Sequence, residues 1–113
     1  SCHDGTIAID RFGTNDGGTE FMTGSKNLGT DLKNAHPVSF VFDSALAAAV
    51  GTLKDPSVAP SGLGGTIQAN MLRADKVQCV SCHNPHNPGN NPKFLVKSNN
   101  NSGLCLTCHN FGN

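Results

Sequence analysis

The chain has 113 residues, no formal net charge, and an apolar fraction of 36%. Charged residues make up only 14% and form no basic cluster, which argues against a nucleic-acid-binding surface. The longest apolar run, ALAAAV at 45–50, is far shorter than the roughly 20 residues of a membrane span. Trp and Tyr are absent, so a chain this short has few large side chains for a core. Five cysteines and five histidines instead indicate a small scaffold held by something other than apolar packing.

Gly, Thr, Asn and Asp dominate residues 4–34. The segment AIDRF at 8–12 alternates in the way of a short strand, and TNDGGTE at 14–20 is the strongest turn signal in the chain. A small hairpin is therefore predicted near 7–22. The same Asp-rich turn matches no complete calcium-binding loop.

The clearest helix is predicted over residues 43–53, DSALAAAVGTL. Asp43 or Ser44 can cap its first turn, and the four alanines favour helical backbone. Gly51 suits its C-terminus because glycine adopts the left-handed conformation that ends many helices.

Only brief elements are predicted for the second half of the chain, where proline and glycine recur. Three prolines in NPHNPGNNP, residues 84–92, remove backbone donors and exclude regular structure there. Ser102 is predicted to cap a helix of one or two turns within 98–110. The other predicted elements are a loop at 55–65, short helices at 67–74 and 76–83, and a strand of two or three residues within 94–96. The fold class is therefore mostly irregular coil with a few short helices, in a single module over residues 1–113.

Two complete C-x-x-C-H motifs carry the chemistry, CVSCH at 79–83 and CLTCH at 105–109. Two thiols on one helical turn suit the two vinyl groups of a porphyrin, and the next imidazole then lies under the iron as its proximal ligand. The opening SCH at 1–3 matches the last three positions of the same motif. Haem c is therefore predicted on Cys79, Cys82, Cys105 and Cys108 with His83 and His109 as proximal ligands, and Cys2 and His3 are read as the remnant of a third site.

A zinc ribbon is the main alternative, because the four motif cysteines are spaced C-x₂-C-x₂₂-C-x₂-C, close to structural zinc sites. Three features count against it. A histidine follows both pairs, where zinc has no use for one, and the SCH at 1–3 would be a coincidence. The prolines of 84–92 also prevent the strand-turn-strand pattern of a ribbon. Disulfides would leave the histidine spacing unexplained.

His86 and His36 are predicted distal ligands. His86 cannot bind the iron under His83, since three residues reach at most roughly 10 Å and the two ligands must approach opposite faces of the porphyrin. It must therefore serve another haem, which draws two haems together. His36 is far enough away in sequence to reach over the haem of 79–83, and Pro37 keeps its backbone extended. The alternative for either histidine is an ordinary surface residue.

The segments HPVSF, CVSCHNPHNP, FLV and LCLTCHN together resemble the doubled C-x-x-C-H family of multihaem c-type cytochromes, over roughly residues 35–110. That family includes cytochromes that polymerise into extracellular electron-conducting filaments. The resemblance implies a small multihaem cytochrome c fold organised around closely stacked haems, with two histidines on each iron. It also implies the distal role for His36 and His86.

The ligand count departs from that pattern, because three haems with two histidines each need six and the chain has five. Exchange between identical subunits cannot supply the sixth, since every subunit would lend and borrow equally. We expect it from a preceding segment, from Met22 or Met71, or not at all, which would leave an open iron. The half motif leads us to expect that the sequence starts inside a longer chain, and a haem held by Cys2 alone would have one thioether bond.

The expected function is electron transfer by about three haem c groups, without enzymatic activity. Covalent haem attachment occurs outside the cytoplasm, so the expected location is extracellular or at the cell surface, with the periplasm as alternative. Expected partners are further copies of the chain in a homopolymer with haem–haem contacts, and redox proteins or extracellular acceptors; nucleic acid and a membrane span are not expected. A soluble periplasmic shuttle, a reductase with one open iron and a zinc-stabilised module are the other functions considered. The haems are expected to form the core.

Overall fold

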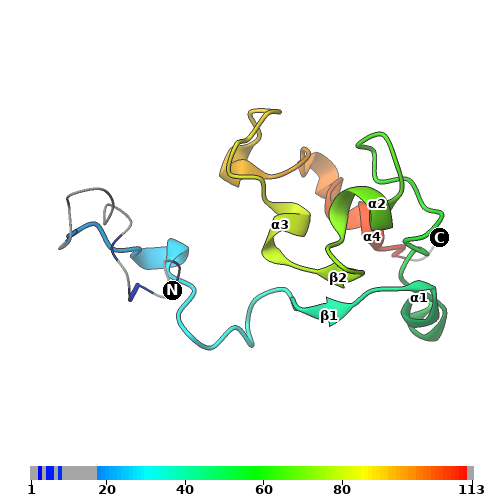
Figure 1. Cartoon of the computed structure of the whole chain (residues 1–113), viewed down its shortest axis with the longest axis horizontal. Coiled ribbons are helices and arrows are strands. Elements are labelled where there is room, and N and C mark those ends of the chain that lie inside the picture. Colours follow the sequence, from blue (N-terminus) through cyan, green and yellow to red (C-terminus); the bar gives the residue numbers. More distant parts are fainter. Residues whose placement is uncertain (1–2, 4, 7, 9–17, 112–113) are drawn as a thin grey trace. The chain divides into compact units, whose positions relative to one another are not determined.

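A computed structural model describes residues 3, 5–6, 8 and 18–111 (Figure 1). The chain divides into two compact units, Ser1–Pro37 and Val38–Asn113. The elements in chain order are η1 (Gly24–Lys26), β1 (Phe40–Val41), α1 (Ser44–Val50), α2 (Ile67–Met71), β2 (Lys76–Val77), α3 (Cys79–Cys82), η2 (Pro92–Phe94), η3 (Asn100–Ser102) and α4 (Cys105–Cys108). All are short and are joined by coil, which confirms the predicted fold class.

The first unit contains η1 and the coil around it. The hairpin predicted near 7–22 lies largely outside the described residues. Across the described residues of both units, no helix combines the length and apolarity needed to cross a bilayer.

Helix α1 forms where it was predicted and ends a few residues earlier. The Asp43 side chain accepts a hydrogen bond from the Leu46 N–H, which satisfies one of the unpaired donors of the first turn. Gly51 ends the helix with φ 76°, a left-handed conformation that costs glycine little.

Strands β1 and β2 form an antiparallel pair that the sequence did not predict, with Phe40 opposite Val77. A two-residue turn precedes β2, in which Ala74 and Asp75 both have positive φ, at 50° and 59°. Consecutive left-handed residues reverse the chain in the sense that suits twisted strands. This turn explains why α2 stops at Met71 instead of reaching 74, and why residue 76 begins a strand and not a helix.

A small polypeptide core lies in the second unit, formed by Phe42, Ala47, Ile67, Met71, Leu72, Val77 and Leu104. Helices α1 and α2 each contribute buried residues to it. Cys82 and Cys108 pack at its edge. The expectation that haem alone would form the core therefore needs correction, because a porphyrin at these cysteines would extend an existing apolar cluster.

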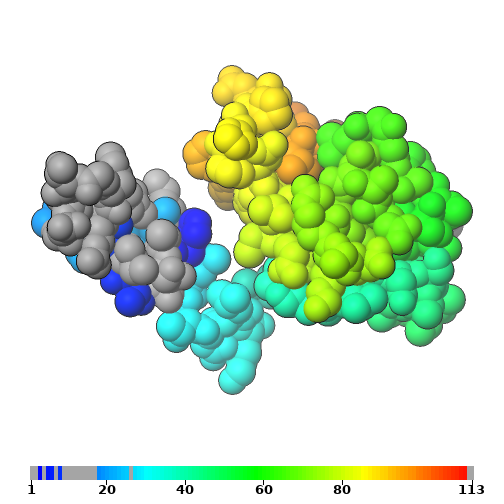
Figure 2. Space-filling view, in the orientation of Figure 1, coloured from blue at the N-terminus to red at the C-terminus, as the bar shows by residue number. Residues whose placement is uncertain are grey.

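The strand predicted at 94–96 is wrong. Lys93 and Phe94 both have φ of 58°, which is incompatible with an extended strand, and they belong to η2 instead. The preceding segment, residues 84–92, stands out from the body of the second unit and is yellow in the space-filling view (Figure 2). Leu95 forms an isolated bridge to His83.

The predicted cap at Ser102 is also wrong. Ser102 ends η3, and Leu104 is the residue that precedes α4. The Asn99 side-chain oxygen accepts the Leu104 N–H at 3.1 Å and the Cys105 N–H at 3.5 Å. Asn99, which lies outside the helix, therefore caps α4 in place of the predicted Ser102.

Candidate haem-attachment sites

Residues 79–83, the first motif, and 105–109, the second motif, have the same local structure. Each pair of cysteines bounds a single helical turn, α3 or α4. The following histidine caps the helix in an extended conformation, and its N–H donates to the carbonyl of the first cysteine at 2.9 Å in both motifs. This places both thiols and the start of the imidazole on neighbouring positions of one turn.

The two residues between the cysteines point in different directions. Ser81 and Thr107 are buried, with 3% and 6% of their surface exposed, whereas Val80 and Leu106 are 46% and 40% exposed. The Ser81 hydroxyl accepts the Gln78 N–H at 2.9 Å, in a capping box that fixes the start of α3. In each motif, the face that carries the Ser81 or Thr107 hydroxyl is therefore packed against the rest of the second unit.

An isolated antiparallel bridge fixes the backbone of each motif histidine. His83 pairs with Leu95, and His109 pairs with Leu53. Hydrogen bonds flank both bridges, from Val96 N–H to Cys82, Asn84 N–H to Phe94, Lys54 N–H to Cys108 and Asn110 N–H to Thr52. A segment remote from each motif in sequence therefore holds the residue expected to ligate iron.

The His83 ring is oriented by a second contact. Its Nδ1 lies 2.9 Å from the Lys93 carbonyl oxygen. Because a carbonyl only accepts, Nδ1 carries the proton and Nε2 is the nitrogen with a lone pair for a metal. Metal-ligating histidines are commonly held in this way, with the other ring nitrogen on a carbonyl or carboxylate. No sequence pattern indicated the Lys93 contact, which depends on the left-handed backbone of η2.

His109 has an aromatic neighbour that the sequence also did not single out. Its ring stacks on Phe111 with centroids 5.0 Å apart and an interplanar angle of 4°. Such stacking limits rotation of the imidazole. Phe111 lies two residues after His109, and this closeness in sequence was the only indication that the two rings would stack.

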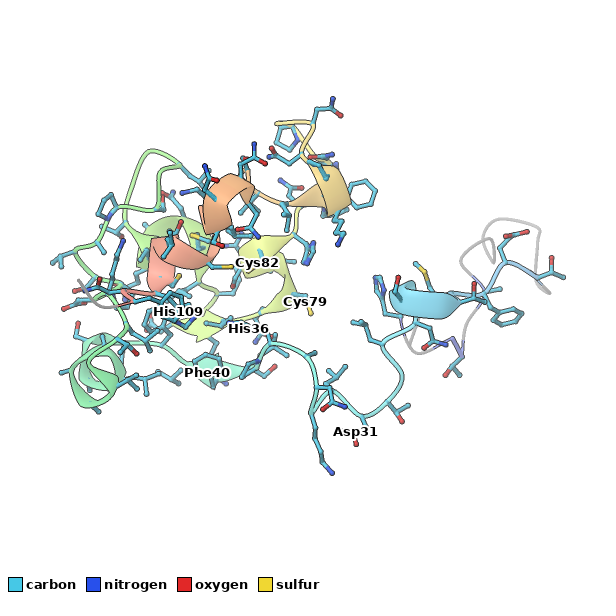
Figure 3. All side chains as sticks on the ribbon, turned by 180° about the vertical axis from the view of Figure 1, so that it is seen from behind. Asp31, His36, Phe40, Cys79, Cys82 and His109 are labelled. Atoms are coloured by element: carbon cyan, nitrogen blue, oxygen red, sulfur yellow. The ribbon has the colours of Figure 1, made fainter. Side chains whose placement is uncertain are left out.

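The cysteines of each motif differ in exposure, and Cys79 and Cys82 project from α3 in different directions (Figure 3). Cys79 and Cys105 are exposed, whereas Cys82 and Cys108 are half-buried, and none of the four forms a disulfide. Burial, with a contribution from Cys105, raises the pKa of Cys82. The two motifs are therefore close enough for their thiols to interact.

Cys108 is the more strongly perturbed thiol. Burial raises its pKa to about 11, and Cys82 adds to the shift. Two lysines, Lys54 and Lys97, oppose it. The thiol is accordingly protonated at neutral pH in the haem-free chain.

The zinc interpretation can be compared with this arrangement. Among the described residues, no three or more His, Cys, Asp or Glu side chains are placed to hold a metal ion together. The part of the chain that the structure describes therefore contains no preassembled zinc site.

A hollow of about 330 Å³ lies beside His83. Its lining combines apolar and polar side chains, namely Leu63, Asn70, Arg73, Val80, His83, Asn84, Pro85, Pro88 and Val96. A porphyrin has the same mixed character, with an apolar ring and charged propionates. Neither Cys79 nor Cys82 lines this hollow, so the fit of haem c to the first motif rests on the two free thiols and the oriented imidazole.

The remaining predicted site residues are His86 in the second unit and Cys2, His3 and His36 in the first. His86 is exposed, and its N–H donates to the Asn84 side chain at 3.0 Å. His3 and His36 are exposed residues of the first unit, and His36 Nδ1 lies 2.8 Å from the Pro37 carbonyl oxygen. Cys2 lies outside the described residues. Their roles stay predictions.

Comparison with known proteins agrees with the motif geometry. Residues 70–112 match the family described as the doubled CXXCH motif, and this segment contains both complete motifs. No curated protein matches the chain. The match supports covalent haem c and electron transfer as the chemistry of this segment. Over residues 70–112, the protein is thus similar to the doubled CXXCH motif of multihaem c-type cytochromes.

Proposed function

We propose that the protein transfers single electrons through about three closely spaced haem c groups. The observation that carries this proposal is the repeated geometry of the two motifs, each with two unbonded thiols on one turn and a histidine fixed by a bridge. When bound, haem c supplies an iron that accepts and releases one electron. Cys82 and Cys108 pack against the same apolar cluster, which supports a short separation of the two haems.

The residues of the chain would attach, ligate and shield the haems. The four motif cysteines form thioethers, and His83 and His109 ligate iron. The Lys93 carbonyl keeps the His83 proton on Nδ1 and increases the basicity of Nε2. The apolar cluster against which Cys82 and Cys108 pack would exclude water from attached porphyrins.

A third haem would be held at Cys2 and His3. His36 would be the distal ligand of the iron under His83, and His86 would be the distal ligand of another haem. The intact mass of the mature protein tests the haem count, and the same sample gives the visible spectrum. We expect a mass increase of two or three haems and sharp low-spin bands on reduction. Protein without visible absorbance would contradict the proposal and favour zinc, and a high-spin component that binds carbon monoxide would instead indicate a reductase.

We further propose that the chain assembles outside the cell into a filament with haem–haem contacts between copies. Cys79 and Cys105 are exposed, so porphyrins attached there would reach the surface as apolar patches that favour association. A head-to-tail contact that does not close yields a filament. The half motif at 1–3 and the second motif are the candidate junction. Redox proteins or extracellular acceptors would exchange electrons at the ends.

Electron microscopy of native material tests the assembly. Helical filaments are the expected result, with the protein recovered from the extracellular or cell-surface fraction. Isolated particles confined to the periplasmic fraction at micromolar concentration would contradict the filament and favour a soluble shuttle.

A further inference from the structure

Two lysine ammonium groups bind the middle of the second motif. Lys54 Nζ donates to the Leu106 carbonyl at 2.7 Å, and Lys97 Nζ donates to the Thr107 hydroxyl at 2.9 Å. Leu106 and Thr107 are the two residues between Cys105 and Cys108. Both positive charges therefore contact the turn that carries both thioether positions.

The Lys97 ammonium is held in a built environment. It also donates to the Ser61 carbonyl at 2.8 Å, and Ser61 is fully buried. Gly62 leaves the necessary room, because a Cβ there would lie 2.7 Å from the Lys97 nitrogen. The side chain is half-buried, so solvent screens its charge less than that of an exposed lysine.

The Lys54 ammonium is anchored through its own backbone. The Lys54 N–H donates to the Cys108 carbonyl at 2.8 Å, next to the bridge between Leu53 and His109. Among the described residues, neither Lys54 nor Lys97 forms an ion pair with a carboxylate. Neither charge is therefore neutralised by a direct ion pair in that part of the chain.

The first motif has different surroundings. The equivalent residues are Val80 and Ser81, and within the described chain no lysine ammonium bonds to either one. Arg73 lines the hollow beside the first motif, is exposed like Lys54, and donates through Nη1 to the Leu72 carbonyl at 3.1 Å, not to the motif itself. The two motifs thus share backbone geometry and differ in fixed charge.

We infer that Lys54 and Lys97 raise the reduction potential of the haem attached at Cys105 and Cys108, an inference that rests on the proposed function. Reduction adds one negative charge to a haem, and a fixed positive charge nearby stabilises the reduced form. This contribution shifts an electron shared by the two motif haems toward the second haem, and so favours transfer from the first motif to the second.

The test is a redox titration of the haem-loaded protein in which each haem is followed by its own NMR signals. Signals are assigned through contacts to the ring protons of His83 or His109. Lys97→Met should lower the ratio of reduced to oxidised second haem about three- to tenfold at fixed potential, and tenfold corresponds to 59 mV for one electron. Lys54→Met should act in the same direction, and the first haem should move less in both variants.

Three controls separate charge from structure. Lys97→Arg keeps the charge and should keep the potential, and Thr107→Val removes the hydroxyl contact while leaving the lysine. Lys76→Met removes an exposed charge on β2, three residues before Cys79, and should leave the second haem unchanged. Equal loss in Lys97→Arg and Lys97→Met, or equal shifts of both haems, would overturn the inference while leaving haem electron transfer intact. Protein that carries no haem would overturn the proposed function itself, and this inference with it.

Discussion

The two cysteines of the second motif differ in their surroundings although they lie one helical turn apart. Cys105 is exposed, whereas burial raises the pKa of Cys108 to about 11. The thiolate is the reactive species, so this difference can be measured directly in the haem-free chain.

We expect iodoacetamide to modify Cys108 at least about tenfold more slowly than Cys105 at neutral pH. The Cys108 rate should rise as the pH approaches 11. Site-resolved mass spectrometry measures both, and denaturant provides the control in which the rates converge. Equal rates without denaturant would contradict the burial of Cys108.

The sign of the corresponding effect on stability follows from the same shift. The folded thiol stays protonated up to about pH 11, whereas an unperturbed one ionises near 9.0. The haem-free chain should therefore lose stability between about pH 9 and 11, because only the unfolded state releases the proton there.

Ser81 and Val80 offer a matched pair within the first motif. Ser81→Ala removes the acceptor of the Gln78 N–H from a buried position and should lower the free energy of unfolding by about 1 kcal/mol. Val80→Ala alters an exposed side chain and should stay within about 0.5 kcal/mol. Denaturant unfolding of the haem-loaded protein measures both, and equal losses would show that the capping box has no special role.

Helix α4 depends on the side chain of Asn99, which lies outside the helix. Asn99→Ala removes the oxygen that accepts the Leu104 and Cys105 N–H groups, and should cost about 1 kcal/mol of stability. Asn100→Ala is the control, since Asn100 is exposed and its side chain makes no recorded bond in the described structure. Denaturant unfolding compares the two, and a larger loss in the control would refute the assigned cap.

The predicted elements that formed are those whose signals are local. Asp43 and Gly51 flank α1 in the sequence and fix both of its ends. The pairing of Phe40 with Val77 is remote in sequence, and the turn at Ala74 lacks the Gly or Asn that usually marks a hairpin. Sequence patterns therefore predicted the helix and missed the sheet.

The candidate site divides in the same way. Its cysteines and histidines form a motif of five consecutive residues, so spacing alone identified them. Two supporting contacts join separate segments of the chain, Lys93 with His83 and Lys97 with Thr107. No local sequence pattern predicts either contact. The attachment chemistry could be predicted, and its supporting contacts needed the fold.

The two units of the protein contain different groups of the predicted haem-binding residues. Residues 38–113 contain both complete motifs, whereas His36 lies in the first unit. We expect a chain of residues 38–113 to carry two haems by intact mass. One iron, the one under His83, should become partly high-spin because its predicted distal ligand is missing.

His36→Ala in the full chain is the matched control and should produce the same high-spin signal without loss of haem. Electron paramagnetic resonance of the oxidised proteins measures the spin state. A fully low-spin spectrum in both proteins would exclude His36 as that ligand.

The two bridges that hold the motif histidines close loops of very different length. The loop from Leu53 to His109 is roughly five times as long as that from His83 to Leu95, and its closure costs about 1.4 kcal/mol more in chain entropy. Contacts between distant segments also form later in folding. The histidine of the first motif should therefore be in place first as the chain folds, and that of the second motif should be the first to open when the protein is heated.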